Sequence, residues 1–185
     1  MRKTVLYLAV SIDGYLARTN GSVDWLFGQD PQMQSDKSYE SFIKGVDTVV
    51  MGWNTYRQVV TELSPNEWPY QGLAAYVITH RDIPAQQRIF FTGENPGTLI
   101  RRIRQQKGKD IWICGGAQIV RQLIQEDLVD KFCLSIIPVI LGNGIPLFEK
   151  MERDIRLRLV RTKVDNGIVE LLYEKDFHLP SQKDD

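Results

Sequence analysis

The amino-acid sequence predicts an α/β fold, with a mostly parallel central sheet and an antiparallel C-terminal hairpin at its edge. Short apolar strand patterns alternate with helical patterns over residues 5–125, which is typical of a helix-covered parallel sheet. From residue 131 onward the pattern is that of strands alone, and such strands form an antiparallel edge. We therefore expect one three-layer domain over residues 1–178, followed by a disordered tail over residues 179–185.

The strands of the first part are short runs of apolar, β-forming residues. They are expected at Val5–Ile12, Thr48–Met51, Ala75–Thr79, Arg88–Phe91 and Ile111–Cys114. Apolar residues at helical spacing predict helices between them, at Ser35–Lys44, Tyr56–Leu63, Pro96–Lys107 and Ala117–Gln125. The third helix has the clearest start, because Asn95 is suited to its N-cap and Pro96 to its first position. Its basic residues indicate the wet face of an amphipathic helix, with an anion site as the alternative.

The last part of the chain predicts a broken strand and a hairpin. Lys131–Leu141 is interrupted by Pro138, and the strands Ile155–Val164 and Ile168–Phe177 flank Asp165-Asn166-Gly167, a strong turn signal. The run Phe132–Leu141 is apolar. Because an exposed apolar strand is normally covered by a partner, we expect a homodimer.

Composition excludes several classes of function. The chain has 185 residues, with 23 basic and 23 acidic side chains; this balance disfavours nucleic acid as a partner. No apolar run is long enough to cross a membrane, and the N-terminal apolar stretch is too short for a signal peptide. A cytoplasmic location is expected. Cys114 and Cys133 are interpreted as buried reduced thiols rather than a disulfide.

The most informative stretch is Ile111–Val120, in which an apolar strand runs through Gly115-Gly116 directly into a helical pattern. Two residues without Cβ let the backbone approach a ligand closely. The first turn of the helix presents unpaired N–H groups at the positive end of the helix dipole. Such a junction suits phosphate, although an ordinary tight turn is the alternative interpretation.

Two further strand ends carry suitable chemistry. Gly52, Asn54 and Thr55 end one strand and open a helix, and Thr79, His80 and Arg81 end another. In open α/β sheets, ligands collect beyond the carboxyl ends of parallel strands. We therefore expect the three turns together to hold the pyrophosphate and the adenosine phosphate of a nucleotide. Singly, Thr55 is an ordinary helix-start residue, and Arg81 before Asp82 is equally suited to a surface ion pair.

Three stretches resemble the dihydrofolate reductase-like family, in order and at plausible separations: residues 9–17 (AVSIDGYLA), residues 49–56 (VVMGWNTY) and residues 111–120. A closer similarity is to the subgroup that includes the reductase half of the bifunctional riboflavin-biosynthesis deaminase-reductase. The markers of that subgroup are Ser-x-Asp-Gly-Tyr at residues 11–15, and Leu-Val-Asp at residues 128–130 followed by PVILGNGIPLF at residues 138–148. The resemblance runs from about residue 4 to residue 177.

The resemblance implies roles for individual residues. It implies NADPH as the cofactor, with NADH as the alternative, and hydride transfer to a pyrimidine- or pterin-like small molecule. Trp25 aligns with a tryptophan beside the substrate in the folate enzymes, and the loop of Gly142 and Gly144 corresponds to one that approaches substrate. Residues implied to contact the cofactor are Ala9 and Leu16 at the nicotinamide, Gly52, Asn54 and Thr55 at the phosphates, Thr79 and His80 near the ribose, and Gly115 and Gly116 at the pyrophosphate.

The chain departs from the family at two positions. Trp53 stands where a basic residue usually follows Met-Gly, which weakens the case for NADPH over NADH. His80, Arg81 or Arg57 could supply the charge for the extra phosphate of NADPH instead. Asp24 stands where the folate enzymes have a proline before the tryptophan. This carboxylate is a further candidate substrate contact.

The proton for the reaction has two candidate sources. We expect Asp13 to orient the substrate, with Asp36 as the alternative acid, because Asp36 falls at the folate carboxylate position when counted back from Met51-Gly52. No Cys/His cluster has metal-ligand spacing, so no metal is expected. The favoured interpretation is an NAD(P)H-dependent reductase; the alternatives are a non-catalytic nucleotide-binding module on the same fold and a dimeric interaction protein.

Overall fold

The computed structural model describes residues 1–30, 32–33, 38–149, 151 and 154–176. The chain divides into two compact units, one of Met1–Val5 with Lys37–Val129 and the other of Leu6–Asp36 with Asp130–Asp185. The single domain expected over residues 1–178 stays a prediction, and the tail over residues 179–185 lies outside the described residues.

The first unit is built on parallel strands in the order β5-β4-β3-β6. Their apolar residues run on without alternation, as in strands that are buried on both faces. In β3 and β6, for example, Val49, Val50 and Ile113 are fully buried. The strands are β3 (Val46–Gly52), β4 (Ala74–Ile78), β5 (Ile89–Thr92) and β6 (Asp110–Gly115).

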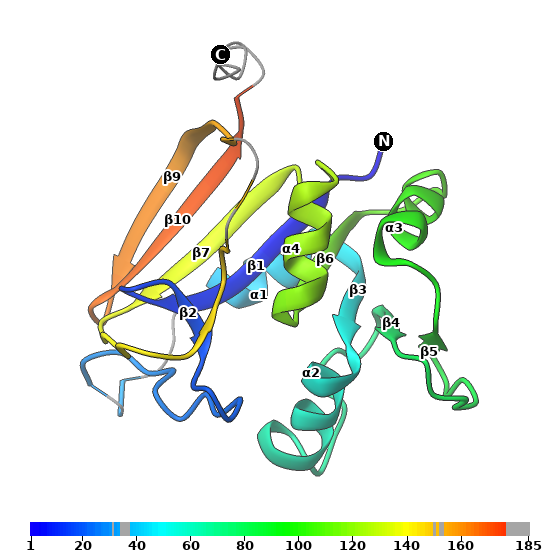
Figure 1. Cartoon of the computed structure of the whole chain (residues 1–185), viewed down its shortest axis with the longest axis horizontal. Helices are drawn as coiled ribbons and strands as arrows, with labels where there is room; N and C mark the ends of the chain where they lie inside the picture. The colour runs from blue at the N-terminus through cyan, green and yellow to red at the C-terminus, as the bar shows by residue number, and fades with distance from the viewer. Residues whose placement is uncertain (31, 34–37, 150, 152–153, 177–185) are drawn as a thin grey trace. The chain divides into compact units, whose positions relative to one another are not determined.

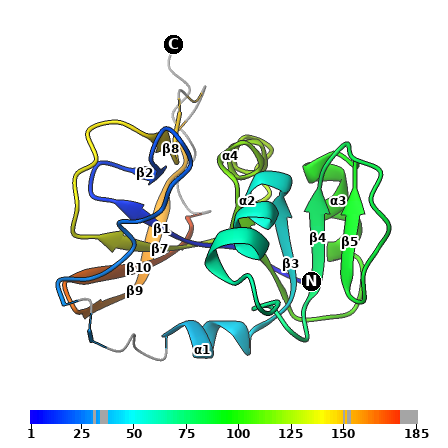
Figure 2. The same ribbon diagram turned by 90° about the horizontal axis from the view of Figure 1, so that it is seen from below.

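Helices of this unit lie on both faces of its strands. In Figure 1, α4 (Ala117–Gln125) lies in front of the strands and α1 (Ser38–Ile43) lies at the back, and Figure 2 shows the same two helices on opposite sides. Trp112 of β6 packs edge-on against Phe42 of α1, with ring centroids 5.5 Å apart. The expected helix-covered parallel sheet is confirmed.

Two other helices differ from expectation in their bounds. Helix α3 (Pro96–Arg104) starts as predicted, because the Asn95 side chain accepts hydrogen bonds from the amides of Gly97 and Thr98, and it ends three residues before Lys107. Its basic face is paired with acids: Arg101 with Glu126 at 2.8 Å, and Arg102 with Glu94 at 2.7 Å. Helix α2 (Trp53–Gln58) begins three residues earlier than predicted and continues as the π-helical turn η1 (Val59–Leu63).

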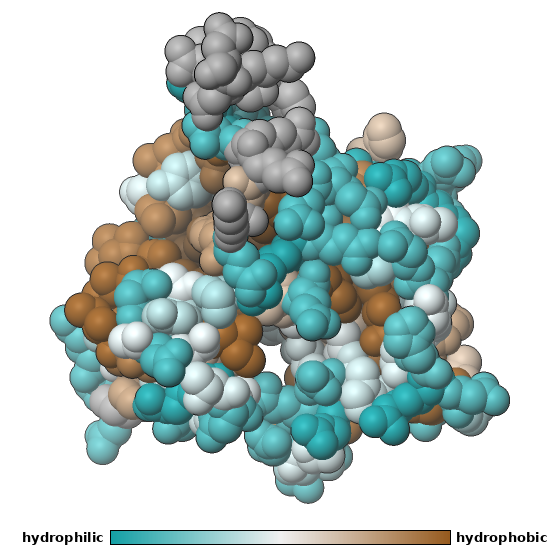
Figure 3. Space-filling model, viewed as in Figure 1, coloured by the Kyte–Doolittle hydropathy of each residue, from teal (hydrophilic) through white to brown (hydrophobic). Residues whose placement is uncertain are grey.

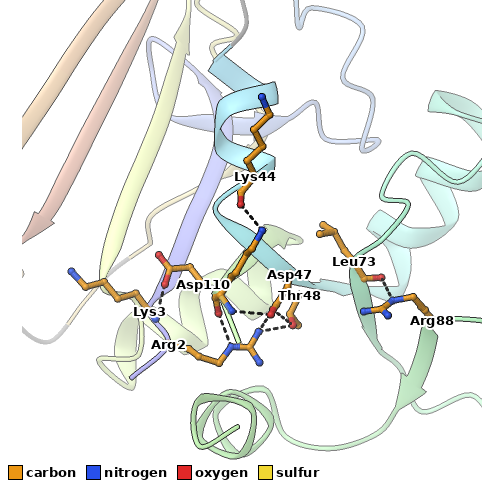
Figure 4. A network of polar contacts seen from close by, with 9 residues as sticks. Arg2, Lys3, Lys44, Asp47, Thr48, Leu73, Arg88 and Asp110 are labelled. Atoms are coloured by element: carbon orange, nitrogen blue, oxygen red, sulfur yellow. Dashed lines mark hydrogen bonds and ion pairs between the residues drawn. The ribbon is translucent and has the colours of Figure 1, made fainter. Parts of the chain in front are cut away.

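A polar network ties the start of the chain to β3 and β6 (Figure 4). The buried Arg2 guanidinium forms an ion pair with Asp47 and donates to Thr48 Oγ1 at 2.6 Å and to the Lys109 carbonyl at 2.6 Å. Asp47 also accepts from the Lys109 amide at 2.8 Å. A Cβ at Gly108 would lie 2.5 Å from Asp47 Oδ2, so the network closes tightly around that glycine.

The second unit contains strands in the order β1-β7-β10-β9 and a small antiparallel pair, β2-β8. β10 pairs antiparallel with both of its neighbours, and β9 is the edge strand. The sequence did not indicate β2 and β8, which are three and two residues long. The strands are β1 (Thr4–Ser11), which begins in the first unit, β2 (Tyr15–Ala17), β7 (Lys131–Ile137), β8 (Ile145–Pro146), β9 (Leu157–Asp165) and β10 (Ile168–Lys175).

The predicted hairpin is confirmed, with β9 and β10 joined at the expected turn. Asn166 and Gly167 have φ values of 47° and 74°, the left-handed conformation that a two-residue hairpin turn requires. The register shifts at Leu172/Tyr173, where a bulge in β9 leaves Val160 without a partner in the β10 register. The antiparallel C-terminal edge is therefore as expected.

The surface first proposed for dimerisation is largely inside the chain. In the run Phe132–Leu141, Phe132, Leu134 and Ile137 are buried, because β7 is an inner strand of its sheet, although Ile140 is exposed. Exposed apolar side chains lie also on the hairpin, over which Figure 3 shows a hydrophobic patch; they include Leu159 and Val164 of β9. Paired residues share a face of the sheet, and the rows on this face are Val164-Val169-Ile136, Thr162-Leu171-Leu134 and Leu159-Tyr173-Phe132.

The opposite face of the hairpin is charged. Arg161 pairs with Glu170 at 2.9 Å, and Arg158 with Glu174 at 3.2 Å. On the apolar face, Phe132 and Leu134 of β7 are buried, whereas Val164 and Leu159 of the edge strand are 69% and 49% exposed. We call the three rows Val164-Val169-Ile136, Thr162-Leu171-Leu134 and Leu159-Tyr173-Phe132 the apolar hairpin face. Among the described residues, no helix is long and apolar enough to span a membrane.

The Arg2 network yields a stability prediction. The substitution Asp47→Ala leaves a buried guanidinium without its carboxylate. We expect it to lower the free energy of unfolding, measured by urea denaturation, by about 1.5–3 kcal/mol, the range for a hydrogen bond to a charged group. The solvent-exposed pair of Arg158 provides the control, because Arg158→Ala should cost less than about 1 kcal/mol. Equal losses in the two variants would contradict the structural role of the network.

The homodimer remains a prediction, and we place its surface on the apolar hairpin face. A second copy always offers a matching apolar surface across a twofold axis. Light scattering should therefore report a dimer at micromolar concentration, and Val164→Lys with Leu159→Lys should give a folded monomer. Lys163→Ser, on the charged face of the same strand, should leave the dimer intact. A monomeric wild-type protein would remove the prediction.

Candidate functional site

The predicted nucleotide-binding turns lie at the same ends of neighbouring parallel strands. Met51 is in register with Gly115, and Gly52 with Ile78, the residue before Thr79. Thr55 Oγ1 lies 3.3 Å from the point that a Cβ on Gly116 would occupy. The structure thus brings the Gly52–Thr55 turn and the Gly115-Gly116 turn together in the first unit.

The geometry of these turns leaves backbone donors available. Gly116 is the N-cap residue of α4 and Gly52 that of α2, and neither helix has a side-chain cap hydrogen bond. The first N–H groups of a helix have no partner within the helix. Gly115 has a φ of 133°, which L side chains rarely adopt, and the peptide bond between the two glycines is cis. An anion that approaches the start of α4 therefore meets amides and no side chain at residue 116.

The third strand end adds a hydroxyl and two side chains that can carry positive charge. Thr79 is buried, and its Oγ1 accepts from the Arg81 amide at 3.2 Å. His80 is exposed. The Arg81 guanidinium lies over the Trp53 ring, 5.0 Å from its centroid. Sequence reasoning missed this contact, although the unusual Trp53 was itself the signal: a ring in place of a basic residue can hold a cation supplied from elsewhere.

Trp53 also packs against other aromatic rings. Tyr56 lies 5.6 Å from Trp53 between ring centroids and packs edge-on against Phe91 of β5 at 5.2 Å. The Trp53 side chain is therefore part of a packed aromatic group that joins α2 to β5. This packing fixes the Trp53 ring, over which the Arg81 guanidinium lies.

In the second unit, Asp13 anchors a loop. Its carboxylate accepts from Ser11 Oγ at 2.6 Å, from the Leu141 amide at 3.1 Å and from the Gly142 amide at 2.7 Å. The hydrogen bond from Ser11, followed by those of the two amides, outweighs desolvation and lowers the pKa of Asp13 below its ordinary value of 3.8. The group is thus a charged acceptor at neutral pH and a poor proton donor.

The loop of Gly142 and Gly144 approaches β2 closely. Gly142 has a φ of 72°, and a Cβ on Gly144 would lie 2.3 Å from the Ala17 carbonyl oxygen. β8 follows immediately and pairs with β2, Ala17 opposite Ile145. Glycine is therefore required at 142 by the backbone conformation and at 144 by the close approach of β2, apart from the implied role of this loop in substrate binding.

The two other substrate candidates differ in exposure. Asp24 is exposed and forms an ion pair with Arg18 at 2.7 Å, and the hydrogen bond from Arg18 is the main cause of its lowered pKa. Trp25 is buried, and its Nε1 has no acceptor among the described residues. A buried donor without a partner is uncommon in folded proteins.

The remaining predicted residues are placed as follows. Ala9 in β1 and Leu16 in β2 are half-buried in the second unit, whereas the glycine turns belong to the first. Asn54 is exposed in α2. Asp36 lies outside the described residues. Within the described part of the chain, no group of three or more His, Cys, Asp or Glu side chains could hold a metal ion, and both cysteines are free.

Comparison with known proteins assigns the family. The RibD C-terminal domain family matches residues 2–169, and the chain belongs to this family. The protein YwjB of Bacillus subtilis (strain 168), which is described as uncharacterized, is 42% identical over 173 residues, 93% of this chain and 97% of YwjB.

Two solved structures place the fold. A riboflavin biosynthesis protein of Shewanella sp. PV-4, described as putative, superposes with a TM-score of 0.81 at 25% identity, over 94% of this chain and 99% of that one. Dihydrofolate reductase from Enterococcus faecalis, in complex with NADP(H) and RAB-propyl, has a TM-score of 0.61 at 14% identity, over 94% of this chain and 96% of that one. The dihydrofolate reductase-like fold is therefore confirmed.

The hydrogen bonds of Asp13 predict a pH dependence. A carboxylate whose pKa is lowered by folding stabilises the folded loop above the unfolded pKa, and this contribution is lost as the pH falls through the folded pKa. The amides of Leu141 and Gly142 should keep their protection from hydrogen exchange until the pH drops below 3.8, the ordinary value. In Asp13→Ala they should exchange faster at neutral pH as well.

Asp24→Ala is the control for this prediction, because Asp24 bonds Arg18 and neither of the two loop amides. Unchanged exchange at Leu141 and Gly142 in Asp13→Ala would show that the carboxylate does not hold the loop.

Proposed function

We propose that the protein is an NAD(P)H-dependent reductase of a pyrimidine- or pterin-like substrate. Its reaction would resemble that of the riboflavin-pathway 5-amino-6-(5-phosphoribosylamino)uracil reductase or of dihydrofolate reductase. The observation that carries the proposal is the meeting of the Gly52–Thr55 turn with the Gly115-Gly116 turn at neighbouring strand ends. Membership of the RibD C-terminal domain family supports it.

The residues of the first unit fit a dinucleotide. A Cβ on Gly116 would meet Thr55 Oγ1, so this space is kept free of side chains. The uncapped start of α4 suits a pyrophosphate, and Thr55 Oγ1 can donate a hydrogen bond to it. The bound cofactor supplies the hydride, and the chain holds and orients it.

Arg81 is the proposed contact for the extra phosphate of NADPH. Trp53 replaces the usual basic residue, and Arg81 is the cation that the structure sets over that ring, 5.0 Å from the centroid. A guanidinium can bind a phosphate through two parallel hydrogen bonds. This pairing favours NADPH over NADH.

On the substrate side, we propose Asp13 for orientation and Asp36 as the alternative acid. Asp13 is exposed, and its oxygens have further acceptor capacity beyond the three hydrogen bonds they receive. A cytoplasmic location is part of this proposal.

A second function is a nucleotide-binding module without turnover. The lowered pKa of Asp13 favours it, because this carboxylate is ionised and committed to the loop at neutral pH. Such a module would bind NADPH without oxidising it.

The test is NADPH oxidation, followed by absorbance, against dihydrofolate, dihydropterins and the ribosylaminopyrimidine intermediate of riboflavin synthesis. Turnover with one of these heterocycles supports the reductase. Tight NADPH binding without turnover supports the module, and no nucleotide binding removes both and leaves the dimeric interaction protein.

The cofactor site predicts the effect of Gly116→Asp. The new side chain fills the gap near Thr55 and places a negative charge at the start of α4, so NADPH binding should be lost while the fold survives. Isothermal titration measures the affinity and circular dichroism the fold. Gln125→Asp, at the other end of the same helix, adds the same charge and should leave binding unchanged. Full affinity in a folded Gly116→Asp protein would refute the site.

Cofactor preference predicts the effect of Arg81→Ala. Loss of one phosphate-binding guanidinium should weaken NADPH binding by about 10–100-fold, since hydrogen bonds to charged groups contribute about 1.5–3 kcal/mol each. NADH binding should change little. Arg57→Ala tests the other candidate cation in α2. A larger loss in Arg57→Ala than in Arg81→Ala would move the phosphate contact to Arg57.

A further inference from the structure

Asn166, in the turn of the β9–β10 hairpin, forms side-chain hydrogen bonds to a segment that is distant in the sequence. Asn166 Oδ1 accepts from the Asp30 amide at 2.8 Å, and Asn166 Nδ2 donates to the Asp30 carbonyl at 2.8 Å. The Asn166 carbonyl also accepts from the Gln29 amide at 2.9 Å. One asparagine thus satisfies both polar groups of the Asp30 main chain, 136 residues away.

The two segments fit against each other without room for side chains. A Cβ on Gly28 would lie 2.4 Å from the Asn166 carbonyl oxygen, and one on Gly167 would lie 2.5 Å from Gln29 Cγ. Gly28 does not have a positive φ. Its lack of a side chain is therefore a requirement of this contact and not of the backbone conformation.

The held segment carries residues of the predicted substrate side. Trp25 is buried, with an Nε1 that has no acceptor among the described residues, and the Phe27 amide donates to the Trp25 carbonyl at 2.9 Å. Leu26 and Phe27 are 42% and 53% exposed. Two exposed apolar side chains, and an indole N–H with no acceptor in the described part of the chain, therefore lie on a segment whose far end is hydrogen-bonded at residues 29 and 30.

We propose that Asn166 is a positioning residue, whose side-chain amide latches Gly28–Asp30 to the hairpin turn and so sets the position of Trp25–Phe27. The effect on substrate rests on the proposed reductase function, but the latch itself does not. In this proposal Asn166 does not touch the substrate or the cofactor. It acts only through the segment that its side chain binds.

The variant Asn166→Gly isolates the latch. Glycine adopts a φ of 47° without strain and suits the hairpin turn, so only the two amide hydrogen bonds are removed. We expect hydrogen exchange at the Asp30 amide and at the Trp25 indole N–H to become about tenfold faster, measured by NMR. Gln87→Gly is the matched control: Gln87 has the same φ of 47° and lies in the first unit, so both rates should stay unchanged.

Gly28→Ala tests the same contact from the other side. Its Cβ would collide with the Asn166 carbonyl oxygen, so the same two protons should exchange faster. Because both substitutions break one contact, the double variant should exceed the stronger single variant by less than the sum of the two effects. Additive effects would show that Gly28 and Asn166 act independently, and would overturn the latch.

Two outcomes separate the latch from the reductase proposal. Faster exchange at Asp30 with an unchanged Trp25 indole would overturn the positioning role, whatever the protein catalyses. Where a heterocycle of the panel is reduced, Asn166→Gly should raise its KM about tenfold and leave both kcat and the Kd for NADPH within twofold. Absence of turnover in the wild-type protein refutes the reductase, and the exchange rates still decide the latch.

Discussion

Parallel register is the constraint on which the candidate cofactor site depends. β3, β4 and β6 run in the same direction, so their carboxyl ends lie along one edge of the first unit. Residues 52–55, 79–81 and 115–116 are separated by long stretches of sequence, and they lie along this edge because β3 is paired in parallel with both β4 and β6. The polar network of Arg2 and Asp47 lies at the opposite ends of these strands, where Val46 is in register with Asp110. One end of these strands therefore carries the Arg2–Asp47 ion pair, and the other carries the candidate cofactor turns, at the carboxyl ends where ligands of open α/β sheets bind.

Local patterns predicted most of the fold, because they depend on residues close together in the chain. Helix α4 begins and ends where its apolar spacing indicated, and Asn166-Gly167 forms the hairpin turn that the dipeptide predicts. β2 and β8 escaped notice, because strands of three and two residues have no measurable period and depend on a partner about 130 residues away. The run Phe132–Leu141 misled for a related reason: apolar content shows that a strand is buried, but not whether its own chain or a second copy buries it.

The sequence indicated which residues belong to the candidate site, but it did not indicate the hydrogen bonds and ring contacts that they form. Asp13 was recognised as a carboxylate in a turn. Its hydrogen bonds, however, join it to the amides of residues 141 and 142, which are 128 and 129 residues away in the sequence. Arg81 and Trp53 each stood out in the sequence, but their contact depends on the strand order β5-β4-β3. In each case the missing information is the spatial neighbour, which one sequence read alone does not contain.

The bulge at Val160 has a consequence for the behaviour of the protein at high concentration. An edge strand offers a row of free main-chain groups, and a flat, apolar edge invites open-ended growth of the sheet by one molecule after another. The extra residue in β9 breaks the even spacing of that row and increases the local twist. A neighbour can then cover the side chains of the hairpin more easily than it can extend its backbone ladder. The apolar surface is thus compatible with a closed pair of molecules and poorly suited to seeding fibres.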